Sequence, residues 1–344
     1  MSDRMHRIST VIACVASTMV SLFVATSARA DTVKLKVGTA AAPDSPWGQT
    51  FKTWKKAVEQ KTNNAVSFDF YFNSTQGSES TMVDKMKAGQ LDGAAVTSLG
   101  LSRFDKRLQV MQLPGVMRSW KTLDAVRTGM GAEFEKMLTD KKITLINWGD
   151  IGLVHFLSKG FAVKGPDDLK GKSPWIYADD PTTKTLYGKI GGVSPFPAEL
   201  MSVLPNIDNG KINCISVPAL AAEMLQWNAK FDNGVDSVNA IAVGGLIMST
   251  DALDKLPADG KAAVIDTGKA MASSAAGLKQ KLRNEDAAAW ERFKARSGVT
   301  IYKPSDADIE KWKPIFTSTI TTLKAGTFDA ALVDKVVALA QKNQ

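Results

Sequence analysis

Strand-like and helix-like segments alternate along the chain from residue 32 onward, and no other feature restricts the possible folds as strongly. Residues 32–37 (TVKLKV) alternate polar and apolar side chains, as half-buried strands do. Residues 47–58 then repeat apolar side chains at helical spacing, and residues 66–72 form a second alternating run. This order predicts two parallel strands joined by a right-handed crossover helix.

Local signals place the start of that first helix. Ser45 is a favourable N-cap residue, and Pro46 follows at the first helical position, where its missing N–H costs nothing. Trp47 opens the apolar stripe of the helix, so we interpret it as a packing residue.

Further strands are predicted at residues 93–98, 143–148, 153–158 and 239–249, with helical patterns between them except between the second and the third. The 93–98 run consists of small residues, which let another backbone or a ligand approach closely. Strands that alternate with helices of ten or more residues indicate an α/β fold.

One helical pattern is unusually long. It runs over residues 257–296 without an evident break, which predicts a helix of about 60 Å at 1.5 Å per residue. One small domain does not need such a helix, so we expect it to lie across two lobes.

The N-terminus has the features of a secretory signal peptide. Arg4 and Arg7 precede an apolar and small-residue run, and an A-x-A cleavage site ends at Ala30. We therefore expect export to the periplasm and a mature chain that starts near residue 31. Residues 11–14 imitate a lipoprotein cleavage box only loosely, and whether Cys14 is ever lipidated stays open.

Composition excludes several classes of protein. The mature chain keeps one cysteine, Cys214, so it has no intramolecular disulfide. The formal net charge of the whole chain is +8, but the lysines are scattered and no arginine-rich run is present. We interpret the surplus as solvated surface and expect no nucleic-acid partner.

Enzyme signatures are scarce. His155 is the only histidine of the mature chain, which excludes a multi-histidine metal site, and neither a G-x-S-x-G elbow nor a phosphate-binding glycine loop occurs. We expect no catalytic residue, no metal site and no cofactor. A hydrolase with paired carboxylates stays open, because Asp and Glu are plentiful.

A set of short motifs, in a fixed order, carries a family resemblance. They are Pro43-Asp-Ser-Pro-Trp47, Met86-Lys-Ala-Gly-Gln-Leu-Asp-Gly93, Leu113-Pro114, Asp168-Leu-Lys-Gly171 and Gly210-Lys-Ile-Asn213, followed by the long helical pattern. With these motifs the chain resembles the DctP-like solute-binding proteins of tripartite ATP-independent periplasmic (TRAP) transporters, over essentially the whole mature chain.

The resemblance implies a two-lobed α/β binding protein of the Venus-flytrap type, with strands that cross between the lobes and a long helix that spans both. Its cleft is expected to close on one small molecule, which the protein, as a monomer, delivers to membrane permease subunits driven by an ion gradient. The expected divisions are a signal peptide (1–30), a first lobe (31–151 with about 239–256), a second lobe (152–238 with about 298–344) and the long helix (257–297).

Three positions depart from the family pattern. Trp175 stands where the resemblance implies an arginine that grips a ligand carboxylate, and a second family arginine falls at about Leu153. Val217 replaces the usual ligand-facing Asn. All three departures remove polarity, and a buried carboxylate without an arginine partner is costly. Simple C4-dicarboxylates are therefore poor candidates, and we expect a ligand with an apolar, aromatic or cationic part.

The candidate ligand contacts follow from these departures and from strand ends. An indole offers an apolar face, an N–H donor and attraction for cations. We expect contacts from Trp175, Trp148, Asp150, His155, Ser98, Thr97, Glu79, Gln76 and Val217. Asp150 is the expected counter-charge of a cationic group. A purely structural role stays open for three of them. Trp175 could fill core space, Asp150 could be a solvated loop carboxylate, and His155 could be a buried histidine with its hydrogen bonds satisfied.

The sequence thus predicts an exported receptor rather than an enzyme. A binding protein for another importer or for a sensor, or a periplasmic hydrolase, is the alternative.

Overall fold

The computed structural model describes residues 31–273 and 277–343. The predicted signal peptide, with Cys14, lies outside these described residues. Within them, no helix combines the length and the apolar character that a membrane crossing requires.

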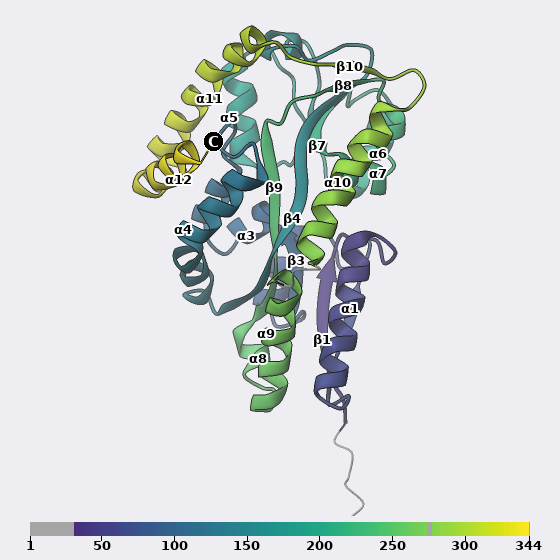
Figure 1. The fold of residues 1–344 in the computed structure, drawn as a ribbon, viewed down its shortest axis with the longest axis vertical. Coiled ribbons are helices and arrows are strands. Elements are labelled where there is room, and N and C mark those ends of the chain that lie inside the picture. The colour runs from purple at the N-terminus through teal and green to yellow at the C-terminus, as the bar shows by residue number, and fades with distance from the viewer. Residues whose placement is uncertain (1–30, 274–276, 344) are drawn as a thin grey trace, which may run out of the picture. The chain divides into compact units, whose positions relative to one another are not determined.

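The described part of the chain is a mixed α/β structure (Figure 1). Its strands are β1 (Val33–Thr39), β2 (Val66–Tyr71), β3 (Gly93–Thr97), β4 (Ile143–Ser158), β5 (Trp175–Ile176), β6 (Phe196–Pro197), β7 (Cys214–Pro218), β8 (Asn233–Val235), β9 (Ala240–Ser249) and β10 (Thr300–Tyr302). Its α-helices are α1 (Pro46–Lys61), α2 (Glu79–Lys87), α3 (Ser98–Ser102), α4 (Trp120–Thr139), α5 (Pro181–Ile190), α6 (Leu200–Asp208), α7 (Ala219–Met224), α8 (Thr250–Leu253), α9 (Ala258–Ser273), α10 (Leu278–Lys294), α11 (Asp306–Gly326) and α12 (Ala330–Lys342). Short 3-10 helices are η1 (Lys106–Gln112), η2 (Pro166–Leu169) and η3 (Asn228–Lys230).

The first β–α–β unit confirms the prediction from the sequence. Strands β1 and β2 pair in parallel, and α1 connects them. Ser45 caps α1 by accepting a hydrogen bond from the Gly48 N–H, at 3.1 Å, and Pro46 occupies the first turn. The apolar stripe of α1 is buried at Phe51, Trp54 and Val58, which fixes the helix on the sheet.

One sheet connects most of the strands. Its order is β10-β8-β4-β9-β3-β1-β2, and β7 also pairs with β4. β4 is a single strand of 16 residues, whereas the sequence predicted two shorter strands separated by a loop. The irregularity that suggested a loop is a bulge between Asp150 and Gly152. Figure 1 shows β4 and β9 side by side, with α4 on one flank and α10 on the other.

Gly152 is required at this bulge. Its φ is +155°, and a Cβ atom there would lie 2.5 Å from both an oxygen of Asp286 and a side-chain carbon of Pro218. Any other residue would therefore push α10 and β7 away from β4.

Four hydrophobic clusters divide the described residues into two lobes. The first lobe contains two clusters, one around Phe134 and Met82 and the other around Trp54 and Phe68. The second lobe contains a cluster around Trp227 and Phe293 and another around Tyr187 and Trp312. β4 crosses between the lobes, because Leu145 belongs to the first and Leu157 to the second.

The two C-terminal helices have different packing partners. α12 packs against α4 and η1 and contributes Val333 and Val336 to the cluster around Phe134 and Met82. α11 packs mainly against α5. The lobe boundaries expected from the sequence, including 298–344 in the second lobe, stay predictions.

The long helical pattern forms two helices. α9 packs mainly on α1 in the first lobe, and α10 packs mainly on α7 in the second. The expected helix over residues 257–297 does not run uninterrupted, because Gly277 has an extended backbone with ψ of 128° and precedes α10 as its N-cap. Residues 274–276, in the middle of the prediction, lie outside the described residues.

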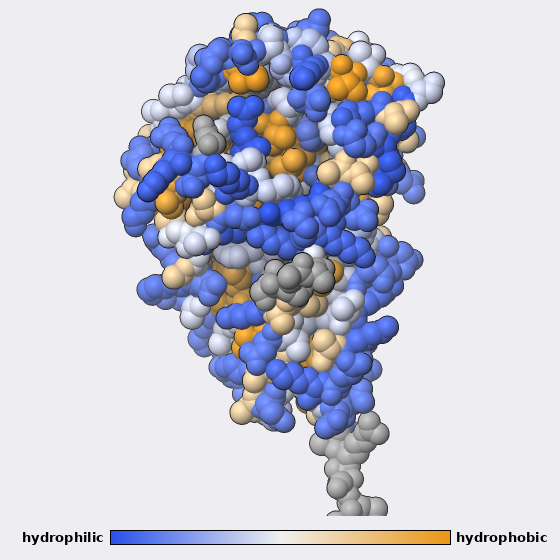
Figure 2. Space-filling view, in the orientation of Figure 1, coloured by the Kyte–Doolittle hydropathy of each residue, from blue (hydrophilic) through white to orange (hydrophobic). Residues whose placement is uncertain are grey.

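The molecular surface agrees with the interpretation of scattered charge. On the face seen in Figure 2, hydrophilic side chains predominate and hydrophobic side chains form separate patches between them. Some ion pairs on the surface are local, such as Lys313 with Glu310, and others join distant parts of the chain, such as Lys61 with Asp266.

Candidate functional site

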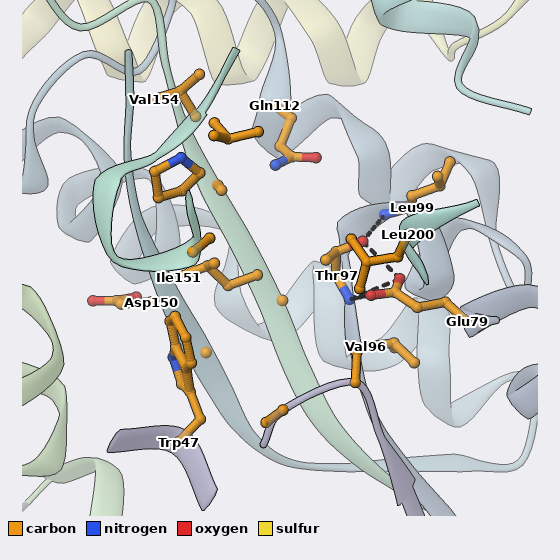
Figure 3. A pocket seen from close by; sticks show the side chains of 18 of the residues that line it. Trp47, Glu79, Val96, Thr97, Leu99, Gln112, Asp150, Ile151, Val154 and Leu200 are labelled. Carbon is orange, nitrogen blue, oxygen red and sulfur yellow. Dashed lines mark hydrogen bonds between the residues drawn. The ribbon is translucent and has the colours of Figure 1, made fainter. Parts of the chain in front are cut away.

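A cavity of about 590 Å³ lies beside the middle of β4. Its walls come from both lobes: from the first, the start of α1 and the end of β3, and from the second, β5, β7 and the start of α5. Figure 3 shows that apolar side chains, among them Val96, Ile151 and Leu200, surround a few polar ones. A cavity of this size and character is suited to a small organic molecule.

Trp175 forms part of the cavity wall and also part of the second-lobe core. Only 8% of it is exposed, and its ring packs edge-on against Tyr177, at 4.7 Å, and Trp227, at 5.2 Å. Its indole N–H donates to the carbonyl of Ala198, at 2.9 Å. Trp175 therefore fills core space and also lines the cavity, and its role in ligand binding stays a prediction. Its indole N–H already has an acceptor, so the ring is the part that is open to a contact.

Glu79 and Thr97 line the cavity from the first lobe as one hydrogen-bonded pair (Figure 3). The Thr97 hydroxyl donates to Glu79 Oε2 at 2.7 Å, and the N–H groups of Thr97 and Gly100 donate to the same carboxylate. Burial raises the pKa of Glu79, although these hydrogen bonds act in the opposite direction. The Glu79 carboxylate thus connects α2 with the end of β3 and with α3.

Asp150 is held by two arginines. Arg127 of α4 binds one carboxylate oxygen, and Arg283 of α10 binds the other through Nε at 2.6 Å. Asp150 is 3% exposed, so the solvated loop carboxylate considered from the sequence is wrong.

The pairing continues on α4 and α10. Arg283 also donates twice to Asp124, at 2.7 and 2.8 Å, and Lys279 donates to Asp124 at 2.6 Å. We call these five residues, Asp124, Arg127, Asp150, Lys279 and Arg283, the Asp150 cluster. It connects α4, β4 and α10, and each of its charged groups has at least one partner of opposite charge within it.

A third carboxylate, Asp180, caps α5. It accepts from the N–H groups of Thr182 and Thr183, from the Thr183 hydroxyl, and from Gln109 Nε2 at 2.8 Å. Burial raises the pKa of Asp180. Because Gln109 belongs to the first lobe and Asp180 to the second, this contact bridges the lobes across the cavity.

Three buried polar atoms on the cavity wall have no hydrogen-bond partner in the described protein. They are Trp47 Nε1, Thr182 Oγ1 and Asn239 Nδ2, and we call them the unpaired donors. Figure 3 places Trp47 among the lining side chains. Buried polar groups are normally paired, so these three wall residues keep hydrogen-bonding capacity that the described protein does not use.

The remaining predicted contacts lie in different places. Trp148 and Val217 line the cavity, whereas His155, Ser98 and Gln76 do not. His155 stacks on Trp290 at 4.1 Å and contacts the Val235 carbonyl through Nδ1, as a structural histidine does. Ser98 is fully buried and donates to Gln112, while Gln76 accepts from Lys85 at 2.8 Å.

The geometry refines one position expected from the resemblance. The resemblance placed a second family arginine at about Leu153. Val154 lines the cavity and Leu153 does not, because neighbouring residues of β4 point to opposite faces. The sequence missed Trp47, Tyr177, Asp180 and Asn239 as lining residues. The sequence does contain a signal for Tyr177, because it follows Trp175 by two residues in an extended segment and so shares its face.

No metal site is evident among residues 31–273 and 277–343, where no group of three or more His, Cys, Asp or Glu side chains converges. The single described cysteine, Cys214, is buried, and burial raises the pKa of its thiol well above the usual range.

Comparison with known proteins agrees with this architecture. Residues 37–325 match the family model of DctP, the bacterial extracellular solute-binding proteins of family 7. The chain belongs to this family. Since family members bind solutes, the DctP-family chain is a binding protein and not an enzyme.

Individual relatives are distant in sequence. The DctP-family chain is 23% identical to the C4-dicarboxylate-binding periplasmic protein DctP of Rhodobacter capsulatus over 314 residues, which cover 89% of this chain and 90% of the relative. It resembles the sugar-acid-binding protein DctPAm of Advenella mimigardefordensis, solved with galactonate, with a TM-score of 0.83 at 16% identity, covering 91% and 99% of the two chains. A TRAP solute-binding protein of Shewanella oneidensis, solved with succinate, gives 0.82 at 17% identity, covering 90% and 99%. The two structures establish the two-lobed fold.

Proposed function

We propose that this solute-binding protein is the periplasmic receptor of a TRAP transporter, capturing one small organic molecule between its lobes and delivering it to membrane permease subunits. The observation that carries the proposal is the cavity of about 590 Å³ with walls from both lobes. A monomer supplies every described wall, so no second copy is needed to complete the site.

The proposed ligand is not a simple C4-dicarboxylate and has an apolar or aromatic part. Lys279 is the one lysine or arginine among the described lining residues, and it is paired with Asp124. A dicarboxylate enclosed there would lack the charge-assisted partners that such ligands need. The rings of Trp175, Tyr177 and Trp47 supply an apolar surface instead.

Capture is proposed to proceed by closure of the lobes. Gly149 and Gly244 oppose each other where β4 and β9 pass the cavity, and a Cβ on Gly244 would lie 2.3 Å from the Val96 carbonyl oxygen. Ligand contacts with both lobes favour the closed form by their differential affinity. At a hundredfold excess over the dissociation constant, a ligand is expected to stabilise the protein by about 2.7 kcal/mol.

A thermal-shift screen of small organic compounds tests this function, with the mature wild type and Trp175→Ala in parallel. We expect hits that raise the unfolding temperature of the wild type and raise that of Trp175→Ala much less. An equal response would remove Trp175 from the site. For each verified hit, small-angle scattering should show compaction, and unchanged scattering would contradict closure.

A further inference from the structure

The charged side chains on the cavity wall are already used by the protein. Asp150 is neutralised by Arg127 and Arg283, and Lys279 is paired with Asp124. These contacts lie within the first lobe and α10. A ligand charge would therefore have to break an internal ion pair before it found a partner.

The two other buried carboxylates are occupied in the same way. Both oxygens of Glu79 accept hydrogen bonds from the Thr97 N–H, and one also accepts from the Gly100 N–H. Both oxygens of Asp180 accept, one of them from Gln109. A cationic ligand would face carboxylates that already accept hydrogen bonds at both oxygens from backbone and side-chain donors.

The unpaired donors are different because none of them carries a charge. Trp47 Nε1 and Asn239 Nδ2 can only donate, and the Thr182 hydroxyl can donate or accept. Trp47 packs against hydrophobic clusters of both lobes, so its side chain lies where the lobes meet. Asn239 directly precedes β9, and Thr182 lies in the first turn of α5.

We propose that the cavity selects an uncharged ligand with an apolar body and hydrogen-bond-accepting oxygen atoms, a neutral carbonyl compound, which Trp47 and Asn239 bind through their N–H groups. This inference rests on the proposed receptor function and narrows its ligand class. It argues against the cationic ligand that the sequence left open, since both oxygens of Asp150 already accept from arginines.

Matched probes of one carbon skeleton test the inference: 3-phenylpropanamide, 3-phenylpropanoate and 3-phenylpropylamine, which at neutral pH are uncharged, anionic and cationic. Titration calorimetry with the mature wild type is expected to give the amide at least about tenfold tighter binding than either ion, since an ion left unpaired in a closed cavity is costly. Succinate and galactonate are titrated as acid controls.

Variants identify the donors. Trp47→Phe and Asn239→Leu each remove N–H donors, and each is expected to weaken amide binding about three- to tenfold, as the loss of one neutral hydrogen bond does. Trp54→Phe is the matched control, because the Trp54 N–H donates internally to Val264 and Thr267 and Trp54 does not line the cavity. This control should leave the affinity for the amide unchanged while the protein stays folded by circular dichroism.

The inference is overturned if the carboxylate, the amine, succinate or galactonate binds as tightly as the amide, or if the amide does not bind. It is equally overturned if Trp47→Phe and Asn239→Leu bind the amide as the wild type does. Tight binding of an acid would leave the receptor role intact, because the compound screen tests that role with ligands of any charge.

Discussion

Two groups of polar side chains surround the middle of β4, and they differ in whether the fold satisfies them. The Asp150 cluster is charged, and its members are paired with one another across α4, β4 and α10. Asp150 and both arginine side chains are largely buried, and Arg127 Nε is the one buried side-chain nitrogen of the cluster without a partner. The unpaired donors are buried and uncharged, and no group in the described chain accepts from them. The charged groups are paired with one another at the junction of these elements, and the neutral donors are the groups that we propose for ligand recognition.

This difference explains how the chain, whose family includes acid-binding relatives, can have a cavity wall without an unpaired lysine or arginine among its described residues. The arginines are present, but Arg127 and Arg283 point to Asp150 and not into the cavity as ligand partners. Figure 3 shows the Asp150 carboxylate directed away from the pocket-lining group around Thr97 and Glu79.

The largest expected effect comes from breaking the Asp150 cluster. Asp150→Ala leaves two buried arginines without their shared carboxylate and is expected to lower the free energy of unfolding by about 3–5 kcal/mol. Urea unfolding of the mature protein measures it. Glu310→Ala, which removes an exposed ion pair with Lys313, should change stability by less than about 0.5 kcal/mol. Equal effects of the two changes would mean that the cluster is not a structural unit.

A second prediction concerns Asp286, a buried carboxylate of α10 next to the cluster. It accepts from the N–H groups of Leu153, at 2.7 Å, and Leu220, at 3.0 Å, and so ties α10 to β4 and α7. Burial raises its pKa from 3.8 to about 6, although these N–H groups act to lower it. The native state therefore holds the proton more tightly than the unfolded chain does. The resulting stabilisation is complete below pH 3.8 and is lost as the pH rises through about 6.

Asp286→Asn cannot titrate and serves as the reference. Between pH 4 and pH 7, the stability of the wild type should fall relative to this variant by about 2.5 kcal/mol. Urea unfolding at several pH values measures the difference. Parallel pH profiles for the two proteins would show that Asp286 does not titrate as described.

The smallest expected effect comes from comparing a hydroxyl group that has hydrogen-bond partners with one that has none. The Thr62 hydroxyl donates to the Val58 carbonyl and accepts from the Val66 N–H, so Thr62→Val should cost about 1 kcal/mol. The Thr182 hydroxyl has no partner, so Thr182→Val should be neutral or stabilising by up to about 1 kcal/mol in the ligand-free protein. Both threonines are buried, at 9% and 6% exposure. A comparable loss at both positions would contradict the unpaired state of Thr182.

The sequence predicted much of the fold, because the relevant signals are local. Alternation and helical spacing identified β1, α1 and β2, and Ser45 with Pro46 fixed the start of α1. The gap predicted within β4 failed because Gly149 and Gly152 resemble a loop until β9 pairs alongside them. Gly277 was missed for the opposite reason, as the helical pattern on both sides of it masks a break.

The site was predicted in part. Trp175, Trp148, Asp150, Thr97, Glu79 and Val217 do line the cavity, and their roles in ligand binding stay predictions. The sequence could not show which polar groups lack a partner, because the partners of Asp150 lie 23 and 133 residues away in sequence. Trp47 and Trp54 share one helical stripe, yet only the Trp54 N–H finds acceptors, on α9.

The most direct test of the account is the identity of the molecule that the protein carries. Native mass spectrometry of the freshly purified mature wild type, followed by fragmentation of the released compound, measures its mass and its ionisable groups. We predict one bound molecule per chain, uncharged at neutral pH and with at least one carbonyl oxygen. A carboxylic acid or an amine bound at one molecule per chain would contradict the account.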